Sequence, residues 1–278
     1  MPLLRRFRLW RSVHAFLSNT IGMSVHVPGA VRRHLRGKHG SGFVAKIDRR
    51  DEMYLFLESH PGTKNPVKAY FDSGESLYES VRTALRGANV NPGDGRNLLD
   101  FACGFGRLAR FLANDVGPEN VFVADIDARA VDFCKATFGV RGFYSTRDPG
   151  ALAHEGLYGA ILVVSLFSHL SLELWAGWLE RLYGMLKDGG VLLFSTHGMH
   201  AYGLLSEEAR APVEEVREGF YYVGLSETKR LSPEDYGTTY VSPEYVEGVI
   251  RGRGLGSVVG FSPHLLWNFQ DVYTLRKP

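Results

Sequence analysis

From about residue 95 onward, apolar runs of strand length alternate with segments of helical character, and this alternation constrains the fold more than any other feature. Such alternation is typical of a parallel sheet with helices on its faces. The runs are almost continuously apolar, as expected for strands that are covered on both sides. The predicted strands are residues 97–102, 121–126, 142–146, 159–166 and 190–196.

The segment between the last two predicted strands has apolar residues at helical spacing, and Gly189-Gly190 is expected to end that helix. Its apolar positions are Leu172, Trp175, Leu179, Leu182 and Leu186. A second helix is predicted near residues 242–253. Two strands follow it, at 256–262 and 270–277, and they are close enough in sequence to pair antiparallel.

Composition favours an ordinary globular protein, with 45% hydrophobic and 22% charged residues in 278. No apolar run approaches the roughly 18 residues of a membrane span. Arginines interrupt the N-terminal apolar segment, which argues against a signal peptide, so we expect a cytoplasmic protein. Only two cysteines occur, Cys103 and Cys134, and we expect reduced thiols and no metal site.

Charge is distributed unevenly along the chain. Residues 1–50 contain 11 Lys and Arg residues and one acid, Asp48, a balance of +10, whereas the whole chain has +2. This basic arm either meets an anionic partner, such as a phosphate-bearing substrate, a membrane surface or nucleic acid, or docks on the acidic body as a solvated helix face. We expect residues 1–80 to form a helical arm or cap and 81–278 the main domain.

A glycine turn follows the first predicted strand in LLDFACGFGRLARFLA, residues 98–113. Gly104 and Gly106 allow the backbone to approach a ligand at the start of a helix, as in sites for dinucleotides and for S-adenosylmethionine. Asp100, in front of the glycines, would repel a pyrophosphate but attract a cationic amino-acid tail. Asp125 ends the next strand and can accept both hydroxyls of a ribose.

LLDFACGFGRLARFL, then VFVADIDARAVDFC, then YGAILVVSLFSHLSLELWAGWLERLYGMLKDGGVLLFSTHG together resemble a class I S-adenosylmethionine-dependent methyltransferase domain over about residues 75–200. The ending QDVYTLRK resembles the last strand of that family. The resemblance implies an α/β, Rossmann-like sheet of seven strands in the order 3-2-1-4-5-7-6, with the last strand antiparallel and helices on both faces. Ala102 stands where the family has its first glycine.

The resemblance also implies S-adenosylmethionine as cofactor and assigns its contacts. Asp100 would hold the amino group, and Gly104 and Gly106 would lie against the methionine part. Asp125 would bind the ribose, with Ile126 against the adenine. The further cofactor-site candidates are Ala102 in the turn, Ser165 at the end of the fourth strand, Asp148 after the third strand, and Tyr70 in the lead-in segment KAYFDSG.

Two histidines are candidates for removing a proton from an acceptor hydroxyl, since His169 and His197 follow the carboxyl ends of the fourth and fifth strands. Each can also be a residue that only fixes its loop. The insertion 199–241 is expected to select the substrate, a small molecule or glycan-type acceptor. Its candidate contacts are Tyr202, Tyr221, Tyr222 and Tyr240. Within it, EEARAPVEEVREGF is interpreted as an amphipathic helix with Val213 and Val216 inward.

Three other functions remain open. The basic arm suits an RNA or protein methyltransferase, but RRM, KH and zinc-ribbon signatures are missing, and so is the N/D-P-P-Y/F signature of base amino-methyltransferases. An NAD(P)-dependent oxidoreductase would share the strand and turn without explaining Asp100. A non-catalytic subunit with the same fold would not require the acids and glycines of the turn.

Overall fold

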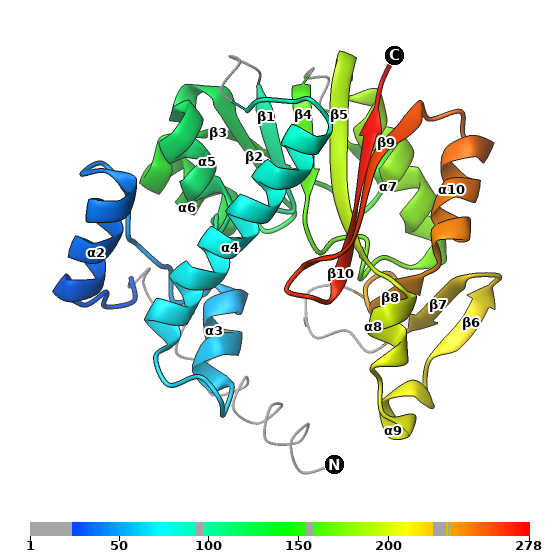
Figure 1. The fold of residues 1–278 in the computed structure, drawn as a ribbon, viewed down its shortest axis with the longest axis horizontal. Coiled ribbons are helices and arrows are strands. Elements are labelled where there is room, and N and C mark those ends of the chain that lie inside the picture. Colours follow the sequence, from blue (N-terminus) through cyan, green and yellow to red (C-terminus); the bar gives the residue numbers. More distant parts are fainter. Residues whose placement is uncertain (1–23, 93–96, 154–157, 225–231, 233) are drawn as a thin grey trace.

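The computed structural model describes residues 24–92, 97–153, 158–224, 232 and 234–278 (Figure 1). Within these residues the chain forms one sheet of ten strands with helices on both faces. The strands are β1 (Leu98–Phe101), β2 (Val121–Asp125), β3 (Arg141–Tyr144), β4 (Tyr158–Val163), β5 (Leu186–His197), β6 (Glu214–Arg217), β7 (Phe220–Val223), β8 (Thr238–Val241), β9 (Ser257–Leu266) and β10 (Gln270–Arg276). The helices are α2 (Gly29–His39), α3 (Glu52–Ser59), α4 (Pro66–Gly87), α5 (Ala109–Val116), α6 (Ala128–Phe138), α7 (Leu172–Gly184), α8 (Met199–Gly203), α9 (Glu207–Arg210) and α10 (Pro243–Gly252), with 3₁₀ turns η1 (Pro118–Asn120) and η2 (Pro149–Ala151).

Five parallel strands lie in the order β3-β2-β1-β4-β5. β10 pairs antiparallel with β5, from Gln270 opposite His197 to Arg276 opposite Val191, and β9 pairs antiparallel with β10. The predicted order is therefore confirmed, because β9 and β10 are the sixth and seventh strands of that scheme. The carboxyl ends of the parallel strands lie along one edge, where ligands of open α/β sheets bind.

Three strands that the sequence did not predict extend the sheet beside the carboxyl end of β5. β8 pairs parallel with β5 through His197 and Tyr240, and β7 and β6 follow antiparallel. The predicted insertion 199–241 accordingly forms α8, α9 and these strands. Figure 1 shows them as a separate flap, on the opposite flank from α2.

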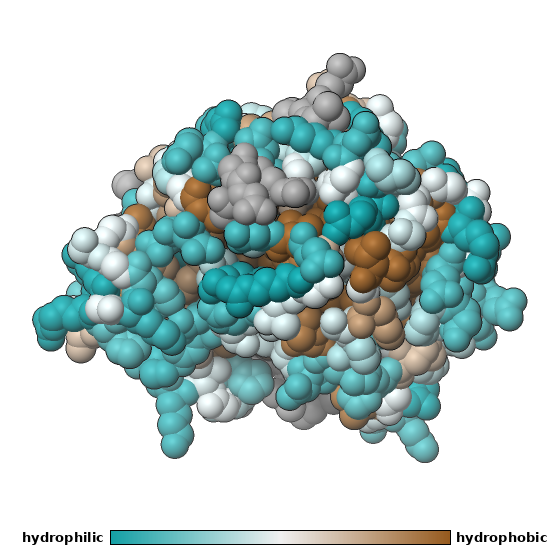
Figure 2. All heavy atoms as spheres, turned by 45° about the horizontal axis from the view of Figure 1, so that its top comes forward, coloured by the Kyte–Doolittle hydropathy of each residue, from teal (hydrophilic) through white to brown (hydrophobic). Residues whose placement is uncertain are grey.

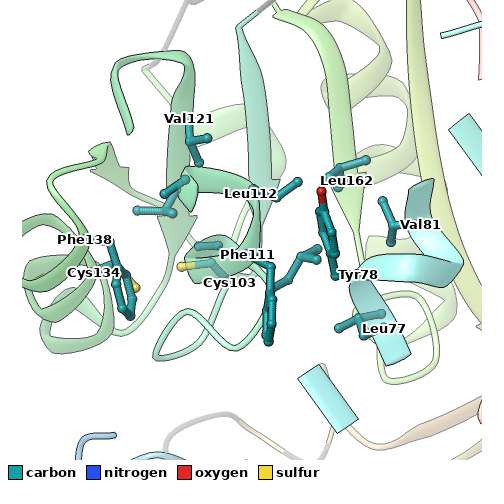
Figure 3. Close-up of a cluster of buried hydrophobic side chains, with 14 of the residues drawn as sticks. Leu77, Tyr78, Val81, Cys103, Phe111, Leu112, Val121, Cys134, Phe138 and Leu162 are labelled. Atoms are coloured by element: carbon teal, nitrogen blue, oxygen red, sulfur yellow. The ribbon is translucent and has the colours of Figure 1, made fainter. Parts of the chain in front are cut away.

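Alternate residues of each central strand face opposite layers. In β1, Leu98 belongs to the core formed with α4, α5 and α6, whereas Leu99 belongs to the core formed with α7 and α10. Figure 3 shows part of the first core, including Leu77, Tyr78 and Val81 of α4, Phe111 and Leu112 of α5, and Leu162 of β4. Two covered faces explain why the strand sequences are continuously apolar. Outside these layers, hydrophilic residues cover most of the face in Figure 2.

The helix between β4 and β5 ends earlier than predicted. α7 ends at Gly184, and Leu186 already pairs with Tyr158 in β5. Gly189 has φ 72° and lies in an irregularity of β5 before Val191. The glycine pair therefore shapes the strand and does not end the helix. Leu186 is buried as a strand residue, although its spacing fits the helix.

The amphipathic helix predicted for EEARAPVEEVREGF is wrong. α9 ends at Arg210, just before Pro212, and Glu214–Arg217 forms β6, which turns through Gly219 (φ 74°) into β7. Pro212 cannot donate the backbone hydrogen bond that a continuing helix needs. Val216 is 44% exposed and does not face the core.

The described part of the segment before the sheet contains α2, α3 and α4. α4 has 22 residues, begins after the cap residue Asn65 and crosses the boundary expected at residue 80. It packs closely on α5, since a Cβ on Gly74 would lie 2.9 Å from the Phe111 ring. Residues 1–23 of the predicted basic arm lie outside the described residues. None of the described helices has the length and apolar character needed to cross a bilayer.

Candidate active site

The glycine turn between β1 and α5 has three residues in the left-handed region: Ala102 (φ 59°), Gly104 (φ 50°) and Gly106 (φ 74°). A side chain in this conformation costs roughly 1–2 kcal/mol, so Ala102 keeps the turn at a cost that glycine would avoid. The two glycines differ in surroundings. A Cβ on Gly106 would lie 2.6 Å from Phe138, whereas a Cβ on Gly104 would meet open space. Gly106 is required by packing on α6, and Gly104 offers bare backbone to a ligand.

Asp100 is buried at the carboxyl end of β1, with 3% of its surface exposed. The Ala109 backbone N–H, at the start of α5, donates to its carboxyl group. The other carboxyl oxygen, Oδ2, has no hydrogen-bond partner among the described residues. Burial, and then the charge of Asp125, raise the pKa of Asp100 to about 8, although Arg107 acts in the opposite direction. The site therefore has a buried carboxyl group that favours a cationic partner.

Asp125, at the end of β2, holds the turn from the other side. Its Oδ2 accepts from the Gly104 N–H at 2.8 Å, and its Oδ1 accepts from the Asp127 N–H at 2.8 Å. Burial raises the pKa of Asp125, and these backbone bonds oppose that rise. The Ile126 N–H also donates to Asp125, and a carboxylate has about four acceptor positions, so about one remains for a ligand hydroxyl. Ile126 follows with 45% of its surface exposed, an apolar side chain open to a flat ligand.

Arg107 lies between the turn and the tip of the β9–β10 hairpin. Its guanidinium is 5.0 Å from the ring of Trp267, and its Nη1 donates to Ser73 Oγ of α4 at 3.5 Å. Burial lowers the pKa of Arg107, and Tyr70, Asp51 and Asp100 oppose that effect. The turn thus places a buried cation near the buried carboxyl of Asp100.

Asp148 and Tyr70 have partners of their own. Asp148 is exposed, and its Oδ1 accepts from the Gly150 N–H at 2.8 Å, which caps η2. Tyr70 is fully buried in α4, where its hydroxyl donates to Asp51 Oδ2 at 2.5 Å and accepts from Arg110 Nη2 at 3.2 Å. Arg110 Nε also donates to the Gly106 carbonyl at 3.1 Å. Tyr70 therefore supports the turn from behind, through Arg110.

Ser165 belongs to a polar network at the ends of β4, β5 and β10. Its backbone N–H donates to Ser195 Oγ at 2.8 Å, and Ser195 Oγ donates to Gln270 Oε1 at 2.8 Å. Gln270 Nε2 donates to Ser165 Oγ at 3.0 Å and lies 3.3 Å from His197 Nε2. Because an amide nitrogen can only donate, Nε2 of His197 accepts and carries no proton. Ser165 also has φ 59°, so the chain turns sharply after β4.

The two predicted histidines lie together, with ring centroids 6.0 Å apart. Burial, and then the charge of His169, lower the pKa of His197 to about 3, so its ring is neutral. His169 Nδ1 lies 2.8 Å from the Gly237 carbonyl, which can only accept. This contact assigns the proton of the neutral ring to Nδ1 and leaves Nε2 as the basic nitrogen. The ring of Tyr236 stacks on His169 at 4.8 Å.

Three of the four predicted tyrosines lie close to one another on the side of His197. Tyr202 stacks on Tyr221 at 4.8 Å and meets Tyr240 at 5.6 Å, and Tyr240 lies 5.4 Å from His197. Tyr222, the next residue in β7, points to the other face and packs on the α7–α10 core. Burial, and then Asp235, raise the pKa of Tyr222 to about 12.

The comparisons with known proteins identify the family. Residues 98–190 match the sequence model of a family described as "Methyltransferase domain". Residues 98–190 therefore belong to a methyltransferase domain, and the fold is that of class I S-adenosylmethionine-dependent methyltransferases. No curated protein sequence matches the chain.

Solved structures share the fold of this methyltransferase domain along most of the chain. The CcbJ methyltransferase from Streptomyces caelestis superposes with a TM-score of 0.55 at 14% identity, covering 82% of this chain and 96% of that one. Magnesium protoporphyrin IX methyltransferase from Synechocystis, with bound SAH, gives 0.52 at 16%, covering 89% and 99%. A 1,6-didemethyltoxoflavin-N1-methyltransferase from Burkholderia thailandensis gives 0.51 at 13%, covering 92% and 93%.

The residues of the turn fit the cofactor of the methyltransferase family. The unpartnered Oδ2 of Asp100 suits an ammonium group, and the space over Gly104 admits a ligand against the backbone. Among the described residues, no group of three or more His, Cys, Asp or Glu side chains is placed to hold a metal ion.

Sequence reasoning missed several residues of the methyltransferase site. Ser195, Phe269 and Gln270 contact predicted site residues, and the charge of Arg107 acts on Asp100. Two carried a usable signal, because Ser195 and Gln270 are polar residues at the ends of otherwise apolar strands. Tyr236 and Phe269 meet the histidines only through the tertiary fold.

Proposed function

We propose that this chain transfers a methyl group to an oxygen or nitrogen atom of a small-molecule acceptor. The observation that carries the proposal is the unpartnered carboxyl oxygen of Asp100 beside the bare backbone of Gly104. The nearby pair of histidines supplies the acceptor side of the site.

On the cofactor side, the residues complement an amino acid joined to a nucleoside. Asp100 binds the ammonium group, and Arg107 is the cation available for the carboxylate. Asp125 uses its remaining acceptor position for a ribose hydroxyl, and Ile126 covers one face of the adenine. When bound, S-adenosylmethionine supplies an activated methyl group on a sulfonium, so the protein contributes mainly alignment.

On the acceptor side, His169 is the base for a hydroxyl or protonated amine. The Gly237 carbonyl fixes the proton on Nδ1, and Tyr236 holds the ring by stacking, so Nε2 is directed to accept a proton. His197 stays neutral and positions the acceptor or the neighbouring ring. Its own orientation depends on Gln270, Ser165 and Ser195.

The acceptor lining is aromatic with polar tips. Tyr202, Tyr221 and Tyr240 continue from His197, and Phe269 lies 4.9 Å from the same ring. Such a wall suits a ring-shaped acceptor with hydroxyl groups, such as a phenol, a hydroxylated heterocycle or a sugar. Tyr222 is left out of this lining, because it supports the wall from the opposite face.

Calorimetric titration with S-adenosylmethionine, S-adenosylhomocysteine and NAD tests the cofactor. We expect the first two to bind and NAD to give no heat. Binding of NAD alone, or of none of the three, would overturn the assignment. Formation of S-adenosylhomocysteine from S-adenosylmethionine in the presence of each member of a panel of phenols, hydroxylated heterocycles and sugars then tests the acceptor class. The control His169→Gln should lose this activity but keep cofactor binding.

A further inference from the structure

Residues 235–239 of the insertion run antiparallel beside residues 168–171, the turn after β4 that carries His169, and Leu170 and Tyr236 form a bridge between the two segments. Three backbone hydrogen bonds of 2.8 to 3.0 Å join them, donor first: Gly237 to His169, Thr239 to Ser168 and Ser171 to Asp235. The backbone of His169 is therefore held by residues 235–239, and its position depends on where that segment lies.

The same segment makes both of the ring contacts that orient His169. Tyr236 stacks on the imidazole with an interplanar angle of 16°, and the Gly237 carbonyl lies 2.8 Å from Nδ1. Gly237 has no room for a side chain, because a Cβ there would lie 2.8 Å from the Tyr222 hydroxyl and would collide with the Val223 carbonyl. A displacement of residues 235–239 would therefore move the stacking ring and the accepting carbonyl together.

Asp235 holds the start of this segment. It is 6% exposed, and both of its carboxylate oxygens meet the guanidinium of Arg147. Nε of Arg147 lies 2.5 Å from Oδ2, and Nη2 donates to Oδ1 at 2.7 Å. This two-point contact fixes the direction of the carboxylate as well as its distance. A buried carboxylate that lost its guanidinium would be left without a counter-charge, which favours movement toward water.

Arg147 comes from a distant part of the fold, the loop between β3 and η2, 88 positions before Asp235. β3 is the outer strand of the parallel sheet, so the ion pair joins the loop after this strand to the insertion. The side chain of Arg147 is 63% exposed. Loss of the arginine should therefore affect the position of residues 235–239 more than the stability of the fold.

We propose that Asp235 is a positioning residue for His169 and that Arg147 is the group that holds it. By fixing residues 235–239, the ion pair keeps the Gly237 carbonyl on Nδ1 and the Tyr236 ring against the imidazole. Nε2 of the neutral ring then stays without a proton. The inference rests on the proposed function, in which His169 is the base, and it adds two residues that act through His169.

The tautomer of His169 is a readout that needs neither cofactor nor acceptor. Nitrogen NMR spectra of protein with isotope-labelled histidine distinguish protonation at Nδ1 from protonation at Nε2, and the signals that disappear in His169→Gln assign the ring. At a pH where the ring is neutral, we expect the single Nδ1–H tautomer in the wild type. Asp235→Asn and Arg147→Gln should each lose this single tautomer and show a mixture of both.

The two substitutions also separate position from charge, because they remove charges of opposite sign. If the ion pair acted on His169 only through its charge, the two variants would have opposite effects, whereas loss of position has the same effect in both. Glu180→Gln is the matched control. It breaks another ion pair between distant elements, with Arg253 at 2.5 Å, and should keep the single tautomer.

The rate of methyl transfer gives a second readout. In Asp235→Asn, kcat should fall at least about tenfold, because the base is no longer aligned, while the Kd for S-adenosylmethionine stays within about twofold. The same substitution added to His169→Gln should cause no further loss, since two changes that act through one group are not additive. A purely structural role of Asp235 would lower kcat in both backgrounds. Circular dichroism checks that each variant folds, and the largely exposed Arg147 provides the variant that leaves the core intact.

A single Nδ1–H tautomer in both Asp235→Asn and Arg147→Gln would overturn the proposal. So would a mixture of tautomers in Glu180→Gln, or a full further loss of kcat when Asp235→Asn is added to His169→Gln. If no acceptor of the panel is methylated, the proposed function fails, and the tautomer measurement still decides whether Asp235 positions His169.

Discussion

The carboxylate of Asp125 accepts a hydrogen bond from the Gly104 amide at 2.8 Å, which ties the end of β2 to the turn after β1. The proposed ribose contact and this loop contact therefore use the same side chain. This coupling means that losing the carboxylate affects both the ribose site and the conformation of the turn.

Replacement of Asp125 by alanine should weaken S-adenosylmethionine binding by about 1–3 kcal/mol, the scale for a hydrogen-bonded charged group. Asp127 provides the matched control, because its Oδ1 accepts from the Arg129 N–H and caps α6. Asp127→Ala should cost about 1 kcal/mol of stability and leave affinity nearly unchanged. Calorimetry and urea unfolding of both variants check this, and equal affinities of Asp125→Ala and wild type would remove Asp125 from the site.

Replacement of Asp100 by asparagine should raise the stability of the protein at high pH but lower its affinity for S-adenosylmethionine. Its folded pKa of about 8 lies far above the usual value for an aspartate, so the folded state retains a proton that the unfolded state loses as pH rises from about 4 to 8. The protonated Asp100 side chain therefore stabilises the folded state at low pH, and this contribution is lost as the pH rises from about 4 to 8. Asp100→Asn should therefore unfold at higher urea concentration than the wild type at pH 8, by at least about 1 kcal/mol, with little difference at pH 4.

The same substitution should abolish most of the affinity for S-adenosylmethionine, because a neutral amide cannot neutralise a buried ammonium. Binding to the wild type should release protons below pH 8, since a cation favours the carboxylate form. Calorimetry in two buffers of different ionisation enthalpy measures this release. A variant that is both less stable at pH 8 and unchanged in affinity would contradict the assigned role of Asp100.

Ala102 has φ 59°, and glycine should be better there. The gain from removing the Cβ, roughly 1–2 kcal/mol, exceeds the extra entropy that glycine gives the unfolded chain, so Ala102→Gly should stabilise by about 0.5 kcal/mol. The control Ala113→Gly, inside α5, should destabilise by about 1 kcal/mol or more. Guanidinium unfolding of the two variants compares them, and changes of the same sign would refute the argument.

The sequence predicted the parallel strands and the order of the sheet because burial on both faces leaves a continuous apolar signal that needs no tertiary information. Asp100 and Asp125 were found for a related reason, since charged residues stand out at the ends of such runs. The insertion was predicted poorly. Val213 and Val216 are three apart, which fits a helix, but Pro212 and Gly219 favour the hairpin that forms.

The contacts of Tyr70 could not be predicted from the sequence at all. Its hydroxyl meets Asp51, 19 positions earlier, and Arg110, 40 positions later, and only the packing of α3 and α5 on α4 joins the three. The lead-in segment, in which Tyr70 was expected to contact the cofactor, carries a buried polar cluster behind the turn.

Tyr70→Phe separates these two interpretations. Loss of the hydroxyl leaves buried Asp51 without one of its partners, so stability should fall by about 1–3 kcal/mol. Affinity for S-adenosylmethionine should stay within about twofold of the wild type, corresponding to roughly 0.4 kcal/mol. The control Tyr54→Phe breaks only an i, i+4 bond to Glu58 and should cost about 0.5 kcal/mol or less. A large loss of affinity with unchanged stability would instead place Tyr70 against the cofactor.

The two histidines should differ in their effects on rate. His169→Gln removes the nitrogen proposed to take the acceptor proton, so kcat should fall by about 10²- to 10⁴-fold with an unchanged Kd for S-adenosylmethionine. His197 has a pKa of about 3 and is neutral throughout the range of an assay, so His197→Gln should leave the shape of the pH–rate profile between pH 5 and 7 unchanged. Release of S-adenosylhomocysteine with the best acceptor of the panel, followed from pH 5 to 9, measures both profiles. An unchanged kcat in His169→Gln would show that alignment alone suffices, and the acceptor would then be a group that needs no base, such as a neutral amine.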